Sequence, residues 1–520
     1  MKLMIIIRPE VITFLLSLSV LFSCSKKSSS ENGPAITGFS ADTVYVGRTM
    51  TITGNGFSTT AKDNLVRIGS TLVTEVLDAT ENALTIKVPA GAGSAKVFVK
   101  ANGKEMTSPA ELVIINQMYW QKVYGGMQDE HGFAIAPVVG GGYLIAGTSE
   151  SADGDVTKNN GLTDMWVVKL NADRSIAWQK VFGGSGSDGA NSIVALADGS
   201  CVVAGYTSST NGDGTGNHGG SDYFIYKLDA GGNVLWKKIL GGTGSDIANK
   251  VIATPDGFVV AGYSSSTNGD VSGNHGVSDY WIVWLDANGT LIRQRSYGGY
   301  DHDQANSITV TADGGYLVAG AAMSVDGDVT ASLGGYDYWI LKLNATGNIE
   351  WQKSFGGSDT DKPQSIIAAK DGGSYIAGYS GSNNGDITGN HGNYDYWVVK
   401  LNANGTIAWQ RSLGGSLPDQ GLAITPAKDG GCAVTGLATS VDGDITGNHG
   451  KSESWIVRLD PKGSIVWQRS LGGTNSEASY ALISTGSSFT VLGYSNSTDG
   501  DVSGLHGTTR LDFWLYQIFD

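Results

Sequence analysis

A unit of about 58 residues recurs seven times along this chain, and this repetition constrains the fold more than any other feature. The first marker is the opening position of a Trp-Gln-Lys-like triplet, at Trp120, Trp178, Trp236, Arg293, Trp351, Trp409 and Trp467. The second marker is the glycine of an Ala-Gly-Tyr-like triplet, at Gly147, Gly205, Gly262, Gly320, Gly378, Gly436 and Gly493. Because a fixed period of this length is typical of repeat architectures, the region from residue 118 onward is expected to be one.

Each copy contains four short runs with the composition of β-strands. In the second copy they are "ANSIVALA", "SCVVAGYT", "DYFIYKL" and "NVLWKKIL", joined by "DG" and "AGG" turns that suit tight hairpins. Four antiparallel strands per copy, repeated around a ring, are typical of a β-propeller. An open solenoid is the competing fold, but solenoid repeats are usually shorter and their ends need caps.

The two ends of the repeat region complement each other. The seventh copy runs through "DFWLYQIFD" to Asp520 without a fourth strand, whereas the region begins with an unpartnered fourth strand, "MYWQKVYGG". Joining the two leaves no open sheet edge, and an open edge invites pairing with other chains. We therefore predict an all-β chain whose residues 118–520 form a seven-bladed β-propeller closed by an N-terminal outer strand.

A smaller domain is expected before the repeats, over residues 34–114. Short alternating segments such as "TMTITGNGF", "NLVRIG" and "SAKVFVKANG", each bounded by Gly, Asn or Pro, predict a β-sandwich. At "PAITGFS", "VGRTMTITGNGF" and "TIKVPAGAGSAKVFV" the stretch resembles the IPT/TIG family of immunoglobulin-like domains. The resemblance implies a spacer or a partner-binding module, and nothing in the segment is typical of a catalytic site.

The first residues have the pattern of an export signal. Residues 1–23 combine a charged start with an apolar run too short to span a bilayer. "LFSC" resembles a bacterial lipobox, which implies cleavage before Cys24 and lipidation of its thiol, with an ordinary secretory signal as the alternative. The polar composition of residues 24–33 predicts a flexible tether. The resemblance implies a protein held only by its N-terminal lipid, at the outer membrane or cell surface, with the side of the membrane left open.

The repeats themselves also resemble a known group. The motifs "GGSGSD", "GNHG" and "DYW" resemble the SBBP-like β-propeller repeats of bacterial lipoproteins and secreted proteins of the Bacteroidetes type. The resemblance covers residues 118–520 and implies the fold together with a binding or scaffold role. It carries no catalytic residue to this chain.

Charge and cysteine content exclude some functions. The formal net charge of -15 disfavours nucleic acid as a partner, because phosphate binding needs clustered Lys and Arg. Metal ions, cationic ligands and neutral polymers are easier partners. Besides Cys24, the chain has only Cys201 and Cys432, which occupy the same position in two copies and are expected to be small buried side chains rather than a disulfide pair.

Three acidic positions recur in every copy, and strand order in a propeller places them on one face. The first is Glu130, Asp188, Asp246, Asp303, Asp361, Asp419 and Glu477; the second is Asp155, Asp213, Asp270, Asp328, Asp386, Asp444 and Asp501; the third is Asp164, Asp222, Asp279, Asp337, Asp395, Glu453 and Asp512. We expect these acids to form a rim that meets a ligand. Ca²⁺ is a possible occupant because it takes several oxygen ligands. The alternative is that each acid caps a turn by accepting backbone N–H bonds.

The remaining chemistry-bearing residues assign no reaction. His218, His275, His391, His449 and His506 occupy the acidic loop of five copies, too far apart for a shared zinc site, and are expected to be polar turn residues. The recurring tryptophans are expected to pack between blades, with sugar stacking as the alternative. His131, His302, Arg293 and Arg510 break the repeat pattern but assemble no catalytic group.

These observations favour a cell-envelope lipoprotein that binds a glycan or a protein through the acidic face of its propeller. A polysaccharide-degrading enzyme, a glycoside hydrolase or lyase, is one alternative, and a purely structural envelope protein is another. Near-perfect repetition argues against an enzyme, because a catalytic site usually breaks symmetry. No catalytic residue is assigned.

Overall fold

A computed structural model of the chain describes residues 34–520 except 42, 46–48, 90–91, 116–117 and 508. The predicted signal peptide, Cys24 and the predicted tether therefore lie outside the described residues. The chain divides into two compact units, with the main boundary between Ile114 and Ile115. The prediction of an all-β chain is confirmed, since the helical segments of the described residues are two short 3-10 turns, η1 (Ala61–Asp63) and η2 (Gly212–Gly214). None of the described helical segments has the length and apolar character that crossing a membrane requires.

The first unit is built from two antiparallel sheets. One sheet has the order β1 (Ala35–Phe39), β3 (Thr49–Asn55), β7 (Ala83–Lys87) and β6 (Val76–Thr80), and the other has the order β2 (Thr43–Tyr45), β9 (Lys104–Ile115), β8 (Ala95–Ala101), β4 (Leu65–Ile68) and β5 (Thr71–Leu72). Alternate residues of the strands are buried, as expected for strands that face a core on one side only.

The second unit consists of four-stranded antiparallel sheets, seven of them within the described part of residues 118–520. Sheet 1 contains β11 (Glu130–Pro137), β12 (Tyr143–Ser149), β13 (Asp164–Leu170) and β14 (Ile176–Phe182); sheet 2 contains β15 (Asp188–Ala195), β16 (Cys201–Thr207), β17 (Asp222–Leu228) and β18 (Val234–Leu240); sheet 3 contains β19 (Asp246–Thr254), β20 (Gly257–Ser264), β21 (Asp279–Asp286) and β22 (Leu291–Tyr297). Sheet 4 contains β23 (Asp303–Val310), β24 (Tyr316–Ala322), β25 (Asp337–Leu343) and β26 (Ile349–Phe355); sheet 5 contains β27 (Asp361–Ala368), β28 (Ser374–Ser380), β29 (Asp395–Leu401) and β30 (Ile407–Leu413); sheet 6 contains β31 (Asp419–Pro426), β32 (Cys432–Ala438), β33 (Glu453–Leu459) and β34 (Ile465–Leu471).

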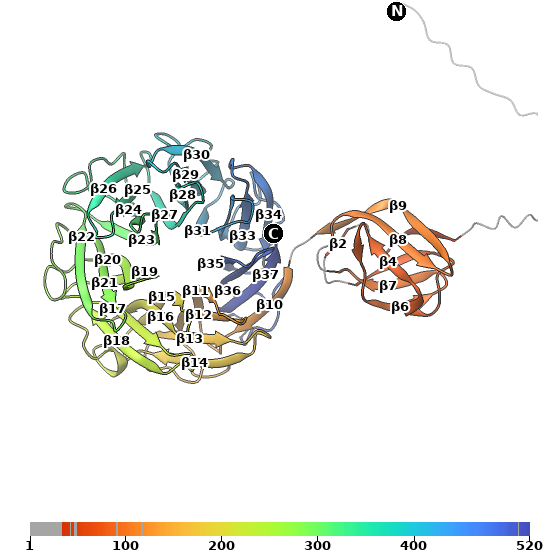
Figure 1. The fold of residues 1–520 in the computed structure, drawn as a ribbon, viewed down its shortest axis with the longest axis horizontal. Helices are drawn as coiled ribbons and strands as arrows, with labels where there is room; N and C mark the ends of the chain where they lie inside the picture. The colour runs from red at the N-terminus through yellow and green to blue at the C-terminus, as the bar shows by residue number, and fades with distance from the viewer. Residues whose placement is uncertain (1–33, 42, 46–48, 90–91, 116–117, 508) are drawn as a thin grey trace, which may run out of the picture. The chain divides into compact units, whose positions relative to one another are not determined.

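Sheet 7 joins the two ends of the second unit. It contains β35 (Glu477–Ser484), β36 (Ser488–Ser495) and β37 (Asp512–Phe519), and its fourth strand is β10 (Met118–Tyr124), which pairs antiparallel with β37. Side chains reinforce this pairing, since Trp120 Nε1 donates to Gln517 Oε1 at 2.9 Å. Figure 1 shows the sheets arranged in a ring, with each first strand near the centre and each fourth strand on the outside.

The tryptophan at the third position of the third strand in most sheets holds neighbouring sheets together. Trp281 and its counterparts are fully buried. The Trp281 indole N–H donates to Gln294 Oε1 of its own sheet at 2.8 Å, while its ring lies 4.5 Å from the ring of Tyr223 in sheet 2. The Tyr223 hydroxyl also donates to the Trp281 carbonyl at 2.7 Å. The same tyrosine-to-tryptophan contacts recur at later sheet boundaries, so these tryptophans pack between sheets as expected.

Cys201 and Cys432 are both free thiols in the described chain and both lie in the core. Each opens a second strand, β16 or β32, at a position that is buried in every sheet except sheet 1. The prediction that they are small buried side chains is confirmed.

Candidate functional site

The first of the three recurring acids is buried in every copy. Glu130 and its six counterparts are 0% exposed. Each carboxylate accepts a hydrogen bond from a backbone N–H four residues earlier, at 2.8 to 2.9 Å, as Glu130 does from Gly126. A group without solvent access cannot touch a polymer or a protein ligand. The expectation that this position forms a ligand-facing rim is therefore wrong, and these acids cap the loop that leads into each first strand.

The second acid fastens the opening loop to the same glycine pair. The Asp155 carboxylate accepts from the Gly125 N–H at 3.3 Å, while the Asp155 backbone N–H donates to the Gly125 carbonyl at 2.8 Å. The same reciprocal pair recurs at Asp213, Asp270, Asp328, Asp386, Asp444 and Asp501. All seven side chains are half-buried. Their repetition follows from the turn that every sheet makes, which is the alternative that the sequence left open.

The third acid is buried as well, and in five copies a histidine binds it. His218 lies with its backbone N and its ring Nδ1 2.8 and 2.7 Å from Asp222 Oδ2, and the side chain of Asp222 is 0% exposed. Equivalent contacts join His275 to Asp279, His391 to Asp395, His449 to Glu453 and His506 to Asp512. The histidines are thus turn residues bound one to a sheet.

Two buried carboxylates therefore face each other at each sheet boundary. A Cβ atom at Gly183 would lie 2.0 Å from Asp164 Oδ1 and 2.6 Å from Asp188 Oδ2, so only glycine leaves room for both acids. Burial raises the pKa of Glu130 to about 7 and the pKa of Asp164 to about 6, and a neighbouring carboxylate adds to each rise. Among the residues that the structure describes, no group of three or more His, Cys, Asp or Glu side chains is placed to hold a metal ion.

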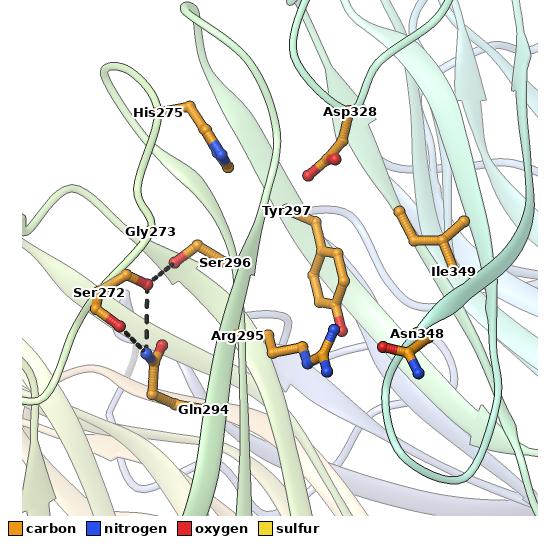
Figure 2. Close-up of a pocket in the computed structure, with 10 residues that line it drawn as sticks. All are labelled: Ser272, Gly273, His275, Gln294, Arg295, Ser296, Tyr297, Asp328, Asn348 and Ile349. Carbon is orange, nitrogen blue, oxygen red and sulfur yellow. Dashed lines mark hydrogen bonds between the residues drawn. The ribbon is translucent and has the colours of Figure 1, made fainter.

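A peripheral cleft of about 510 Å³ lies between sheets 3 and 4. Figure 2 shows His275 and Asp328 at its upper edge, with Tyr297 between them and Arg295 below. Tyr297 is fixed by a hydrogen bond from its hydroxyl to the Gly347 carbonyl at 2.5 Å. Most of this lining recurs elsewhere in the ring, because every copy has an acid at the Asp328 position and a lysine or arginine at the Arg295 position. A smaller cleft between sheets 1 and 2 is lined by Asp213.

The centre of the ring is lined by two rows of side chains that differ from copy to copy. A β-bulge in each first strand projects one residue toward the centre; these residues, the bulge ring, are Phe133, Asn191, Asn249, Asn306, Gln364, Leu422 and Tyr480. The next residues, the second ring, are Ala134, Ser192, Lys250, Ser307, Ser365, Ala423 and Ala481. Cavities of about 190 and 170 Å³ share the bulge ring as their lining.

Sheets 2 to 5 contribute the polar half of this central cavity. Their bulge-ring residues are amides, and the three asparagines bind across to the next sheet: Asn191 Nδ2 donates to the Ala248 carbonyl at 3.0 Å, Asn249 Nδ2 to the Ala305 carbonyl at 2.8 Å, and Asn306 Nδ2 to the Pro363 carbonyl at 2.7 Å. Because the three asparagine nitrogens are engaged in this way, the asparagine side-chain oxygens remain able to accept hydrogen bonds from a ligand.

Sheets 6, 7 and 1 contribute the apolar half. Where sheets 7 and 1 meet, the rings of Phe133 and Tyr480 lie edge to face with centroids 5.0 Å apart, and Tyr494 lies 5.8 Å from Tyr480 and 5.0 Å from His131. Burial lowers the pKa of His131, which favours the neutral imidazole. Aromatic rings beside hydrogen-bond acceptors suit a ligand with one apolar and one hydroxylated face, such as a sugar ring.

Sequence reasoning missed the central cavity, although it singled out His131 as a residue that breaks the pattern. The detectable signal is variation among the copies: three residues after the buried acid the seven copies have Phe, Asn, Asn, Asn, Gln, Leu and Tyr. His302, the other histidine outside the pattern, lies in sheet 4 near Ser278, 3.1 Å from its hydroxyl, and does not join His131.

Comparison with known proteins gives matches of limited extent. The chain is 27% identical over 176 residues to the regulatory protein FlaEY of Caulobacter vibrioides, a stretch that covers 31% of this chain and only 18% of that protein. Among solved structures, the WD40 β-propeller domain of Doa1 is similar with a TM-score of 0.43 and 11% identity, covering 77% of this chain and 96% of that one. An auxiliary nutrient binding protein from Bacteroides thetaiotaomicron has a TM-score of 0.34 and 11% identity, covering 94% of this chain and 98% of that one. Residues 34–113 match the IPT/TIG domain model, which confirms the resemblance drawn for that segment.

Proposed function

We propose that this chain is a cell-envelope lipoprotein that acts as a binding or scaffold module for a glycan or a protein. Its lipid is attached at Cys24, residues 24–33 form the tether and the IPT/TIG domain forms the spacer. Residues 118–520 act as a closed seven-bladed propeller of SBBP-like type, and the ligand binds at the centre of the ring on the face where the acidic loops gather.

The lining of the central cavity carries this proposal. Positions that build the scaffold hold the same type of residue in all seven copies, as the buried acids do. The bulge ring instead divides into amides from sheets 2 to 5 and apolar or aromatic residues from sheets 6, 7 and 1. Packing alone does not require such a division, because the copies share one backbone conformation. A ligand with one polar and one apolar side would account for the division of the bulge ring into amide and apolar residues.

The size of the cavity limits what can bind. Pockets for drug-sized ligands have volumes of roughly 300–1,000 Å³, whereas each central cavity has a volume below 200 Å³. A small molecule or the end group of a polymer therefore fits, whereas the body of a polysaccharide would lie across the loops above.

Binding of the purified full-length protein to an array of defined polysaccharide fragments tests the proposal. We expect retention of glycans with accessible end groups, and loss of that retention in Tyr480→Ala. Tyr300→Ala is the matched control because Tyr300 is 73% exposed and makes none of the ring contacts described for Tyr480. Absence of binding to any glycan or envelope protein would refute the proposal, and release of cleaved product from a bound glycan would replace it with the hydrolase or lyase alternative.

A further inference from the structure

One side chain in the second ring is unlike the other six. Lys250 occupies a position that holds alanine or serine in every other copy, and its side chain lines the central cavity. The register of β19 with β20 places Lys250 directly after the bulge. The corresponding registers place Ser192 directly after the bulge of sheet 2 and Ser307 directly after that of sheet 4. The cavity is thus supplied with one ammonium group that the fold does not need at this position.

The Lys250 ammonium has no partner within the described chain. No carboxylate lies within ion-pair distance of it and no hydrogen bond to it is formed there, in contrast to Lys342 and Lys400, which are 2.8 Å from the carboxylates of Asp313 and Asp371. Burial lowers the pKa of Lys250, and no nearby anion raises it. The Lys250 side chain is half-buried, so its ammonium group is only partly desolvated, and an anionic ligand in the cavity would offset the cost of that desolvation.

Two hydroxyl groups flank the ammonium group along the ring. Ser192 Oγ accepts a hydrogen bond from the N–H of Val251, the neighbour of Lys250, at 3.1 Å, and Ser307 Oγ accepts one from the N–H of Ile366 at 3.2 Å. Both serines are buried, and the hydroxyl proton of each remains to be donated. Sheets 2, 3 and 4 thus offer a row of donors: hydroxyl, ammonium, hydroxyl.

We infer that the central cavity binds a carboxylate, with Lys250 as its charge partner and the hydroxyls of Ser192 and Ser307 as flanking donors. The inference rests on the proposed function and names the ligand class for the same cavity: a small carboxylic acid or the acidic end group of a glycan. A single negative charge matches a single ammonium group. A dianion such as a phosphate monoester would leave excess charge inside a protein whose net charge is already -15.

The aromatic half of the cavity fits the rest of such a ligand. Phe133 and Tyr480 belong to sheets 1 and 7, whereas Lys250 belongs to sheet 3, so the two contacts come from different parts of the ring. A sugar acid meets both requirements, since its ring has an apolar face and its carboxylate extends from the edge.

Calorimetric titration of the full-length protein with glucuronate and with glucose tests this inference, because the two sugars differ in the carboxylate. We expect glucuronate to bind at least about tenfold more tightly than glucose, as a charge-assisted hydrogen bond provides. Lys250→Ala should remove that preference while leaving the weaker binding of glucose unchanged. The variant is expected to fold, since alanine occupies this position in three other copies, and its melting temperature checks that.

Lys428→Ala is the matched control, since it removes the same charge from an exposed site. Equal affinities of the unaltered protein for the two sugars would overturn the carboxylate inference and leave the proposed function standing. An unchanged preference in Lys250→Ala would place the anion elsewhere and overturn it as well. Failure to bind either sugar would overturn the carboxylate inference alone, whereas absence of binding to every glycan of the array and to every envelope protein would overturn both proposals.

Discussion

Replacing Glu130 by Gln should reduce the loss of thermal stability that the second unit undergoes as the pH rises. The Glu130 carboxyl is 0% exposed, and its neighbour across Gly125 is the buried Asp512. Burial is the main reason that the pKa of Glu130 is raised from 4.5 to about 7 in the folded protein, and the charge of Asp512 adds to it. Glutamine has nearly the same shape and imitates the protonated acid at every pH.

The sign and the size of the effect follow from linkage. A carboxyl whose pKa is raised on folding binds its proton more tightly in the native state, so its contribution to stability is fully present below pH 4.5 and is lost as the pH rises through 7. At about 1.4 kcal/mol per pKa unit, the loss amounts to about 3 kcal/mol. For a unit of roughly 400 residues, this corresponds to about 4 °C in melting temperature. The stability of Glu130→Gln relative to the unaltered protein should therefore rise by this amount between pH 4 and pH 8.

Melting temperatures of both proteins across this range, at constant ionic strength, measure the difference directly. Glu150→Gln serves as the control, because it makes the same replacement at an exposed residue directly after β12 of the same sheet. If the difference between Glu130→Gln and the unaltered protein stays constant from pH 4 to pH 8, the Glu130 carboxyl is not held in the neutral form by burial, and the reasoning about paired carboxylates fails with it.

Three further outcomes are expected. Gly183→Ala should lower the stability by about 1–3 kcal/mol, measured by thermal melting, because its methyl group would lie 2.0 Å from Asp164 Oδ1 and displace a buried carboxylate; an unchanged melting temperature would show that the paired acids can separate freely. Excess Ca²⁺ and EDTA should give the same melting temperature, since the described acids are engaged as turn caps, and a shift of several degrees would instead establish a metal site. Cys24→Ser should abolish incorporation of labelled palmitate in the bacterial host and release the protein from the membrane fraction, whereas persistent labelling would refute lipidation at this residue.

The fold could be predicted to a useful depth because its determinants are local and repeated. Each third strand begins with an acid, which is followed by two aromatic or apolar residues in six of the seven copies, and a short turn with a glycine in it or directly after it separates each first strand from the second, so that the copies reinforce one another. The boundary at residue 114 can be predicted because short alternating segments give way there to the repeat of about 58 residues. The pairing of β10 with β37 supplies the fourth strand that the seventh copy lacks.

The site could not be predicted to the same depth, for two physical reasons. An aspartate at the start of a strand, such as Asp188, has the composition of an exposed loop, and only the packed structure reveals that its carboxylate is directed inward to the amide of Gly184. The residue that points into the central cavity is selected by the bulge between Ala248 and Lys250, a shift of register that no local pattern announces. The sequence does show that the residue type at this position differs among the copies, which indicates that packing of the fold does not fix it.

The pairing of β10 with β37 also orders events during biosynthesis. Trp120 and Gln517, which are joined by a hydrogen bond, stand 397 residues apart, and closing a fully flexible loop of this length would cost about 5 kcal/mol in chain entropy, a cost that sheets already folded within the loop reduce. Six sheets can form from contiguous chain as it emerges, but the seventh must recruit β10, which left the ribosome before any of those six sheets. A chain interrupted anywhere before β37 keeps two unpaired edges open to its neighbours. Only a chain that contains both β10 and β37 can therefore pair the two outer edges of its sheets with each other.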